Sequence, residues 1–256
     1  MRCLPVALFA TVAGLALTPT SALANPTTFA QTTQNSSTPQ FSIMQSGGTT
    51  TISATGQDFF TFFVPGTPFG SNPVLANFSL TATSTQTGSC GSVTCPSGDS
   101  FTEQGYSGTF QYLVSGGAFA GMNLLSGTFS VSGTPANSGG TLTSRINGSS
   151  GGYDASQTAG NPTGVVMTSA FLNFAGVTTE SASWGLSGIS PSFAVNATAT
   201  NLTLPQSGTA FLASGVGTFA SEPPPGTFGA PEPATMALLG SALVGLGLIG
   251  KKRLAR

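Results

Sequence analysis

Apolar and polar residues alternate along much of the chain between residues 49 and 220. The clearest stretch is 74–85, where Ala76 and Phe78 fall on one side and Asn77 falls on the other. A strict period of two is typical of an antiparallel strand with one buried face and one solvated face. Residues 74–85 are therefore predicted to form a half-buried strand.

Comparable short runs, separated by Gly, Pro, Asn and Ser, recur along this part of the chain. The predicted strands are residues 49–55, 58–64, 74–85, 108–115, 124–132, 141–146, 165–174, 181–187, 193–204 and 211–219. No stretch between them shows a convincing helical periodicity. About ten strands without a helix predict an all-β body, an antiparallel β-sandwich-like fold.

The remaining segments of the body are interpreted from their composition. Residues 25–48 are rich in Gln, Thr, Asn and Ser with little periodicity, which predicts a loose polar leader before an extracellular β-rich domain at 49–220. Residues 147–164 are rich in Gly, Ser and Asn and are predicted to be a loop. Residues 221–230 contain three consecutive prolines and are predicted to be a stiff linker.

The N-terminal end has the pattern of a secretory signal peptide. Arg2 precedes a mostly apolar stretch, and Ala22 and Ala24 then form an A-x-A cleavage site. Residues 1–24 are therefore predicted to be removed by the general secretion machinery, so that the mature chain begins at Asn25. A chain with this leader is exported.

The C-terminal end has the pattern of a membrane anchor. Residues 234–250 contain neither charge nor proline. With the preceding proline they would span about 27 Å as a helix, close to the roughly 30 Å of a bilayer core. The basic residues that follow are Lys251, Lys252, Arg253 and Arg256. A single transmembrane helix at 234–250 is predicted, with the basic end in the cytoplasm and the body on the other side.

Pro231, Glu232 and Pro233 immediately precede this span, and proline favours an extended, exposed segment at that point. The triplet, the short apolar span and the basic terminus resemble the PEP-CTERM sorting domain of Gram-negative bacteria, over about a tenth of the chain. This resemblance implies that an inner-membrane exosortase recognises the triplet, processes the tail at 231–256 and releases the body outward.

The charges of residues 25–230 limit the functions of the body. Arg145 is the only base, and there is no Lys or His, so the net charge is −5. The acids are Asp58, Asp99, Glu103, Asp154, Glu180 and Glu222. Nucleic-acid binding is excluded because a phosphate backbone needs a basic surface. Without His, the commonest general base and metal ligand is missing. The acids are interpreted as surface charges in loops or at strand edges, and no enzyme activity, catalytic residue, cofactor or metal site is predicted.

Cys90 and Cys95 are a close pair in an exported chain and are predicted to form a disulfide. Metal binding is the alternative, but no further Cys or His completes a site within the body. Trp184 alternates with apolar neighbours and is predicted to pack in the core. Tyr106, Tyr112 and Tyr153 are predicted to be exposed, where they could contact a glycan. Tyr153 is the best placed of them, since it lies in the predicted loop.

Together these observations predict a non-enzymatic exported protein, held transiently in the inner membrane and then released to the cell surface or medium. Its expected role is structural or adhesive, within the extracellular polysaccharide matrix of a biofilm. The first alternative is a carbohydrate-binding β-sandwich that presents the tyrosines to polysaccharide. The second is a surface protein whose tail is never cut and that stays tethered to the membrane.

Overall fold

The structure is a computed structural model, and it describes residues 26–92, 94–130, 139–156, 164–198, 201–203 and 210–227. The strands are β1 (Thr27–Gln34), β2 (Phe41–Ser46), β3 (Thr49–Phe62), β4 (Val74–Ser84), β5 (Ser89–Cys90), β6 (Ser100–Val114), β7 (Asn123–Phe129), β8 (Gly140–Arg145), β9 (Ser150–Ser156), β10 (Val165–Thr168), β11 (Leu172–Asn173), β12 (Thr179–Ser190), β13 (Asn196–Thr198), β14 (Asn201–Thr203), β15 (Phe211–Glu222) and β16 (Gly226–Thr227). Within these residues the helical content is one 3-10 turn, η1 (Gly117–Phe119). The described part of the chain contains no helix long and apolar enough to cross a membrane. The prediction of an antiparallel all-β body is confirmed.

Eight of the strands form a closed circuit of antiparallel pairs. The order is β15, β12, β9, β8, β6, β4, β3 and β1, and β1 pairs again with β15. Strand β2 pairs with both β15 and β3 beyond the end of β1. Closing the sheet in this way leaves few unpaired backbone groups at strand edges.

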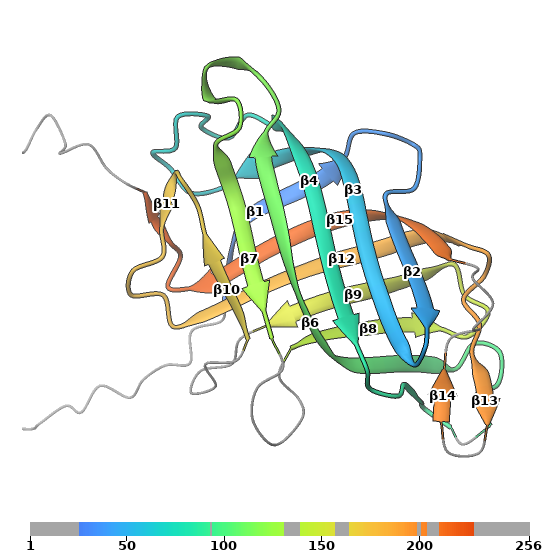
Figure 1. The fold of residues 1–256 in the computed structure, drawn as a ribbon. Helices are drawn as coiled ribbons and strands as arrows, with labels where there is room; N and C mark the ends of the chain where they lie inside the picture. Colours follow the sequence, from blue (N-terminus) through green and yellow to red (C-terminus); the bar gives the residue numbers. More distant parts are fainter. Residues whose placement is uncertain are drawn as a thin grey trace, which may run out of the picture.

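The circuit is flattened into two layers (Figure 1). Strands β2, β3, β4, β7 and β10 lie at the front of the view, and β8, β9, β12 and β15 lie behind them and cross them at a large angle. Strand β6 belongs to both layers, because its first residues pair with β8 and its last residues pair with β4 and β7. A register shift between Glu103 and Tyr106 marks the change of partner.

Aromatic side chains fill the space between the layers. Trp184 of β12 is 1 % exposed, which confirms its predicted place in the core. Its ring centroid lies 5.1 Å from that of Phe110, 5.7 Å from Tyr153 and 5.8 Å from Phe219. Trp184 Nε1 donates a hydrogen bond of 3.0 Å to the hydroxyl of Tyr112. One tryptophan thus joins β12 to side chains from β6, β9 and β15.

The predicted polar leader is wrong, because residues 25–48 contain β1 and β2. Gln and Thr occupy six of the eight positions of β1, and β2 is only six residues long, so neither strand shows a strong pattern in the sequence. Phe29 and Phe41 nevertheless point inward and are 1 % exposed. The backbone of β1 pairs on both sides, with β3 and with β15, so the ladder hydrogen bonds hold it despite its polar side chains.

The predicted loop at 147–164 is also wrong, because it contains β9. Its glycines fit the sheet rather than break it. An added Cβ at Gly151 would lie 2.5 Å from the carbonyl oxygen of Thr143 on β8. On β8 itself, an added Cβ at Gly140 would lie 2.1 Å from the hydroxyl of Tyr153 on β9. Glycine is therefore present where strands and a large ring approach closely.

Other strand boundaries differ from their predictions. The two strands predicted at 49–55 and 58–64 are one strand, β3, which continues through Gly56. At that residue an added Cβ would lie 2.4 Å from Nε2 of Gln40, so the glycine leaves room for this side chain. The run at 165–174 forms the separate strands β10 and β11. The run at 193–204 forms the hairpin of β13 and β14, paired over its described residues.

Gly108→Ala is expected to destabilise the fold. An added Cβ would lie 2.1 Å from the carbonyl oxygen of Thr81 on β4, and backbone cannot move aside as a flexible side chain does. Overpacking of this kind costs about 1–3 kcal/mol. The matched control is Gly185→Ala, where the nearest atom is 3.6 Å away in a Val216 methyl group. Urea unfolding should give a lower midpoint for Gly108→Ala only, and equal midpoints would contradict the close approach.

Candidate functional site

The residues of both predicted sorting signals lie outside the described part of the chain. These are Ala22, Ala24 and Asn25 at the N-terminal end, and Pro231, Glu232, Pro233, Lys251, Lys252, Arg253 and Arg256 at the C-terminal end. The same holds for the predicted transmembrane segment 234–250. Their assignments therefore stay predictions from the sequence pattern.

The two ends of the described body lie at the same end of the fold. Thr27, at the start of β1, pairs with Ser221 near the end of β15. Thr227 is the last described residue, and its hydroxyl lies 3.0 Å from where a Cβ on Gly66 would stand. Gly66 belongs to the loop that follows β3. The last residue of β3 pairs with a residue in the first half of β1. Thr27 and Thr227, near the two limits of the described body, thus lie at the same end of the fold.

The predicted exposure of the tyrosines is wrong. Tyr106, Tyr112 and Tyr153 are each 0 % exposed. The Tyr106 hydroxyl donates a 2.9 Å hydrogen bond to Oε2 of Glu103 inside the fold. The Tyr153 ring stacks on Trp184 instead of lying in a loop. These side chains belong to the core, so they cannot present their rings to a glycan at the surface.

Three of the six acids are buried, contrary to the prediction that they are surface charges. Asp58, Glu103 and Glu180 are 3 %, 2 % and 7 % exposed. Each occupies an inward position of its strand, as Asp58 does on the same face of β3 as Phe60. Successive side chains of a strand point to opposite faces of the sheet, whatever their chemistry. An acid at an inward position is therefore buried.

Burial raises the pKa of each of these carboxyl groups, because a charge is costly in an apolar interior. The pKa of Asp58 rises to about 6, although a hydrogen bond with Gln40 opposes the shift. The pKa of Glu103 also rises to about 6, opposed by the neighbouring Thr50 hydroxyl and by the hydrogen bond from Tyr106. The pKa of Glu180 rises to about 7. Its carboxylate accepts the backbone N–H of Met167 and so satisfies one group at the edge of β10.

Asp58 and Glu103 are not arranged as a catalytic pair. Glu103 lies beside Thr50, near the start of β3. Asp58 lies eight positions further along the same strand, which corresponds to about 26 Å of extended chain. Glycosidases hold their two carboxyl groups about 5–10 Å apart, on either side of the scissile bond. Asp58 and Glu103 are much too far apart for that chemistry.

The predicted disulfide is present between Cys90 and Cys95, with their Cα atoms 5.5 Å apart. Asp99 lies beside it and accepts hydrogen bonds from the Ser92 hydroxyl at 2.7 Å and the Ser92 N–H at 2.8 Å. These bonds hold the pKa of Asp99 below its usual value. Arg145 donates to the carbonyl of Gly98 at 3.0 Å in the same region. Asp99 and Arg145 thus place one acid and one base beside the short loop that the disulfide closes.

The outward side of the front layer carries two rows of uncharged side chains, all of them polar except Val166. Cross-strand register places Ser53, Thr81, Thr109, Thr128 and Val166 in one row. The neighbouring row contains Thr55, Ser79, Gln111, Ser126 and Thr168. We call these ten residues the hydroxyl face. Sequence alternation predicted the outward position of Ser79 but could not show that the rows align across β3, β4, β6, β7 and β10.

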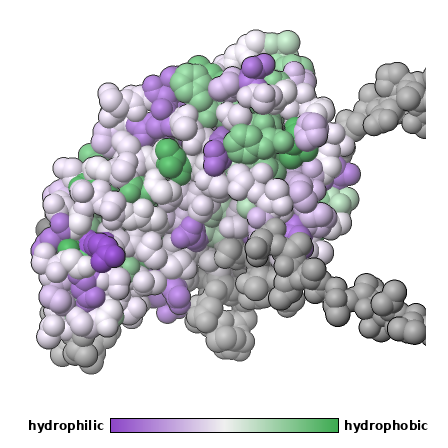
Figure 2. All heavy atoms as spheres, turned by 180° about the vertical axis from the view of Figure 1, so that it is seen from behind, coloured by the Kyte–Doolittle hydropathy of each residue, from purple (hydrophilic) through white to green (hydrophobic). Residues whose placement is uncertain are grey.

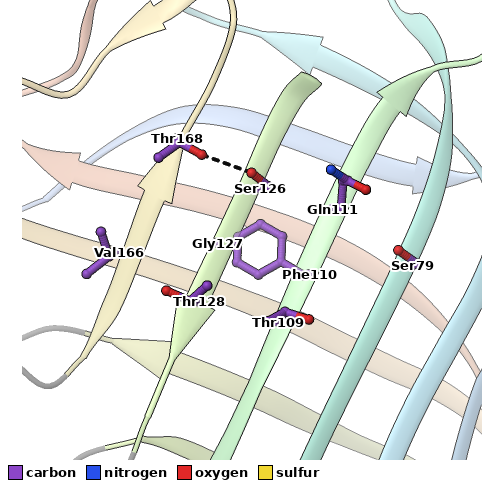
Figure 3. Close-up of a pocket in the computed structure, with 9 residues that line it drawn as sticks. All are labelled: Ser79, Thr109, Phe110, Gln111, Ser126, Gly127, Thr128, Val166 and Thr168. Atoms are coloured by element: carbon purple, nitrogen blue, oxygen red, sulfur yellow. Dashed lines mark hydrogen bonds between the residues drawn. The ribbon is translucent and has the colours of Figure 1, made fainter. Parts of the chain in front are cut away.

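A shallow hollow of about 310 Å³ opens in the hydroxyl face between β4, β6, β7 and β10 (Figure 3). Its floor is the backbone of Gly127 and the ring of Phe110, which lies under β7 because Gly127 has no side chain to displace it. Ser126 and Thr168 are joined at its side by a 2.9 Å hydrogen bond between their hydroxyls. The hollow therefore has an apolar floor and a polar rim.

None of the charged side chains of the body lies on the hydroxyl face. Asp58, Glu103 and Glu180 are inside. Asp99 and Arg145 lie beside the disulfide. The other two acids are Asp154, on β9 in the back layer, and Glu222, at the end of β15. The back layer also has apolar side chains scattered over its outer surface (Figure 2), and Leu212 and Val216 of β15 are about half exposed. The uncharged character of the front is thus a consequence of where the fold places its few charges.

Raised pKa values of buried acids predict that the protein is more stable in mild acid. Such an acid binds its proton more tightly when folded. Its contribution to the free energy of unfolding is therefore complete below the pKa of the unfolded chain, near 4. This contribution is lost as pH rises through the pKa values of the folded protein, about 6 to 7. The melting temperature should fall between pH 4.5 and pH 7.5. Partial desolvation by the surrounding sheet also raises the pKa of Asp154, whose side chain is at the surface, and this acts in the same direction.

Glu103→Gln and Glu180→Gln should each reduce this slope, because an amide carries no charge to bury. Asp99→Asn is the control. The pKa of Asp99 is lowered by its hydrogen bonds, so this group stays ionised in both states throughout the window and should leave the slope unchanged. A melting temperature that rises from pH 4.5 to pH 7.5 would contradict the burial of these groups.

Comparison with known proteins identifies the C-terminal tail. Residues 230–253 match the family model described as the PEP-CTERM protein-sorting motif. No curated protein and no solved structure matches the chain. The matched residues contain the Pro-Glu-Pro triplet, the apolar segment and the first basic residues. The chain therefore carries a PEP-CTERM protein-sorting motif at its C-terminal end, and this motif supports an exported protein that is targeted to an exosortase.

Proposed function

We propose that this protein is a non-enzymatic structural component of the extracellular polysaccharide matrix, released to it by exosortase processing. The observation that carries the proposal is the sorting motif at residues 230–253, because it directs the whole body outward. The A-x-A site before Asn25 supports export from the other end of the chain.

The chemistry of the body supports a role without catalysis. It contains no histidine, and its only lysines are those in the tail. Three of its six acids are buried in the core with raised pKa values, where they are remote from any substrate. The charged turn beside Cys90 pairs Asp99 with backbone and hydroxyl donors instead of leaving it free for chemistry. The surface of this body is suited to contact and not to reaction.

The placement of the chain ends supports transient anchoring followed by release. The segment between Thr227 and the predicted span at 234–250 has six residues, which reach about 20–22 Å when fully extended. While residues 234–250 are held in the inner membrane, the body would stand close to its outer surface. Cleavage near Pro231 would free the body without cutting any described strand, because β16 ends at Thr227.

Intact mass of the native protein, measured separately in medium and membranes, tests this proposal. We expect a species that begins at Asn25 and has lost the basic residues 251–256, recovered from the medium or matrix. Glu232→Ala should shift most of the protein to a membrane-bound form that keeps the tail, because it removes the only charged residue of the triplet.

Pro224→Ala, at an exposed position between β15 and β16, is the matched control and should be processed like the native chain. A native chain that keeps residues 251–256 in the membrane would overturn release and favour a permanently tethered surface protein. Equal processing of Glu232→Ala and native chains would remove the triplet from its assigned role.

A further inference from the structure

We propose that the hydroxyl face binds a chain of neutral polysaccharide, with the hollow over Gly127 as the principal contact. This inference rests on the proposed function, since it names the component of the matrix that the exported body would meet. It also gives the carbohydrate-binding alternative a surface other than the buried tyrosines.

The first argument is charge. The outward side chains of the two rows include neither an acid nor a base, although the body as a whole carries a net charge of −5. A polyanion such as a polyuronate or a nucleic acid needs cations, and the only cation of the body, Arg145, lies elsewhere beside Asp99. A cationic partner would find no acid here. Charge complementarity therefore favours an uncharged ligand.

The second argument is hydrogen-bonding capacity. Thr109, Gln111 and Thr128 surround the hollow, and in the described part of the chain their side chains form no hydrogen bond to protein. A hydroxyl can donate and accept at once, and an amide offers two donors and an acceptor. A sugar ring presents the same mixed groups around its edge. The rim is thus complementary to a polyhydroxylated ligand.

The third argument is geometry. Neighbouring strands stand about 4.8 Å apart, and outward residues of one strand are about 6.8 Å apart, so the rows form a regular lattice across five strands. Val166 is 49 % exposed at the edge of the hollow and supplies apolar surface, whereas the Phe110 ring beneath Gly127 is only 2 % exposed. An extended polymer can lie along such a row and place the C–H side of one ring against Val166.

Other classes of partner fit this face less well. The centre of a protein–protein interface is enriched in aromatic residues, Met and Arg, and depleted in Ser. The rows contain none of the favoured residues and are composed mostly of Ser and Thr. A lipid surface is bound by a large apolar face or by clustered bases. Val166 is the single aliphatic side chain in the two rows.

Affinity electrophoresis of the exported protein in native gels tests the proposal. The probes are hydroxyethyl cellulose and dextran as neutral chains, and alginate as a polyuronate. We expect retardation by at least one neutral chain and none by alginate. The triple variant Thr109→Ala, Gln111→Ala and Thr128→Ala should raise the apparent Kd at least tenfold. These side chains are outward, so the variant should keep its fold, which circular dichroism and the melting temperature will check.

The matched control removes three outward hydroxyls from the back layer, in the variant Ser183→Ala, Ser187→Ala and Thr218→Ala. It should bind like the native protein. No retardation by either neutral chain, retardation by alginate alone, or equal binding by the two triple variants would each overturn the proposal. The outcome is separable from release, because protein kept in the membrane can be extracted with detergent and run in the same gels.

Discussion

The fold depends on one buried hydrogen-bond network that connects its layers. The indole N–H of Trp184 on β12 donates to the hydroxyl of Tyr112 on β6. That hydroxyl lies 3.4 Å from Oγ1 of Thr32 on β1, which in turn accepts the N–H of Gly217 on β15 at 3.0 Å. Four strands of the closed circuit therefore meet at one point. Buried tryptophan and tyrosine need such partners, since an unpaired polar group in a core is costly.

Glycine makes this junction possible. An added Cβ at Gly217 would stand 2.6 Å from Thr32 Oγ1 and 3.2 Å from Trp184 Nε1, so a side chain there would displace the network. The same principle recurs at Gly127, whose missing side chain lets Phe110 lie under β7. In this chain, glycines inside strands create room for large aromatic rings. The hollow on the hydroxyl face follows from the same packing, because the ring that fills the core is also its floor.

The surface of the protein is a consequence of its scarcity of charge. With seven charged residues in the body, burying Asp58, Glu103 and Glu180 leaves four to place outside. These lie beside the disulfide, on β9 and at the end of β15, so the front layer is left with hydroxyls and amides. An exported body with this surface has no means of binding polyanions by charge. Its sorting tail and its contact surface are separate, since the tail follows β16 and the rows lie along the middle of the strands.

The sequence by itself determined the sorting tail, the all-β class, the disulfide and the core position of Trp184. Each of these features is indicated by the order of residues in a single stretch of the chain or by its period-two alternation. No information about distant parts of the chain is needed to recognise them. Only the tertiary structure decided that β1, β2 and β9 are strands, because their polar residues and glycines are held by partners distant in the sequence. It also decided that Tyr153 and Glu103 face inward and that the hydroxyl rows align. Those outcomes depend on strand register and on the bulge before Tyr106, and register is set by pairing across the sheet.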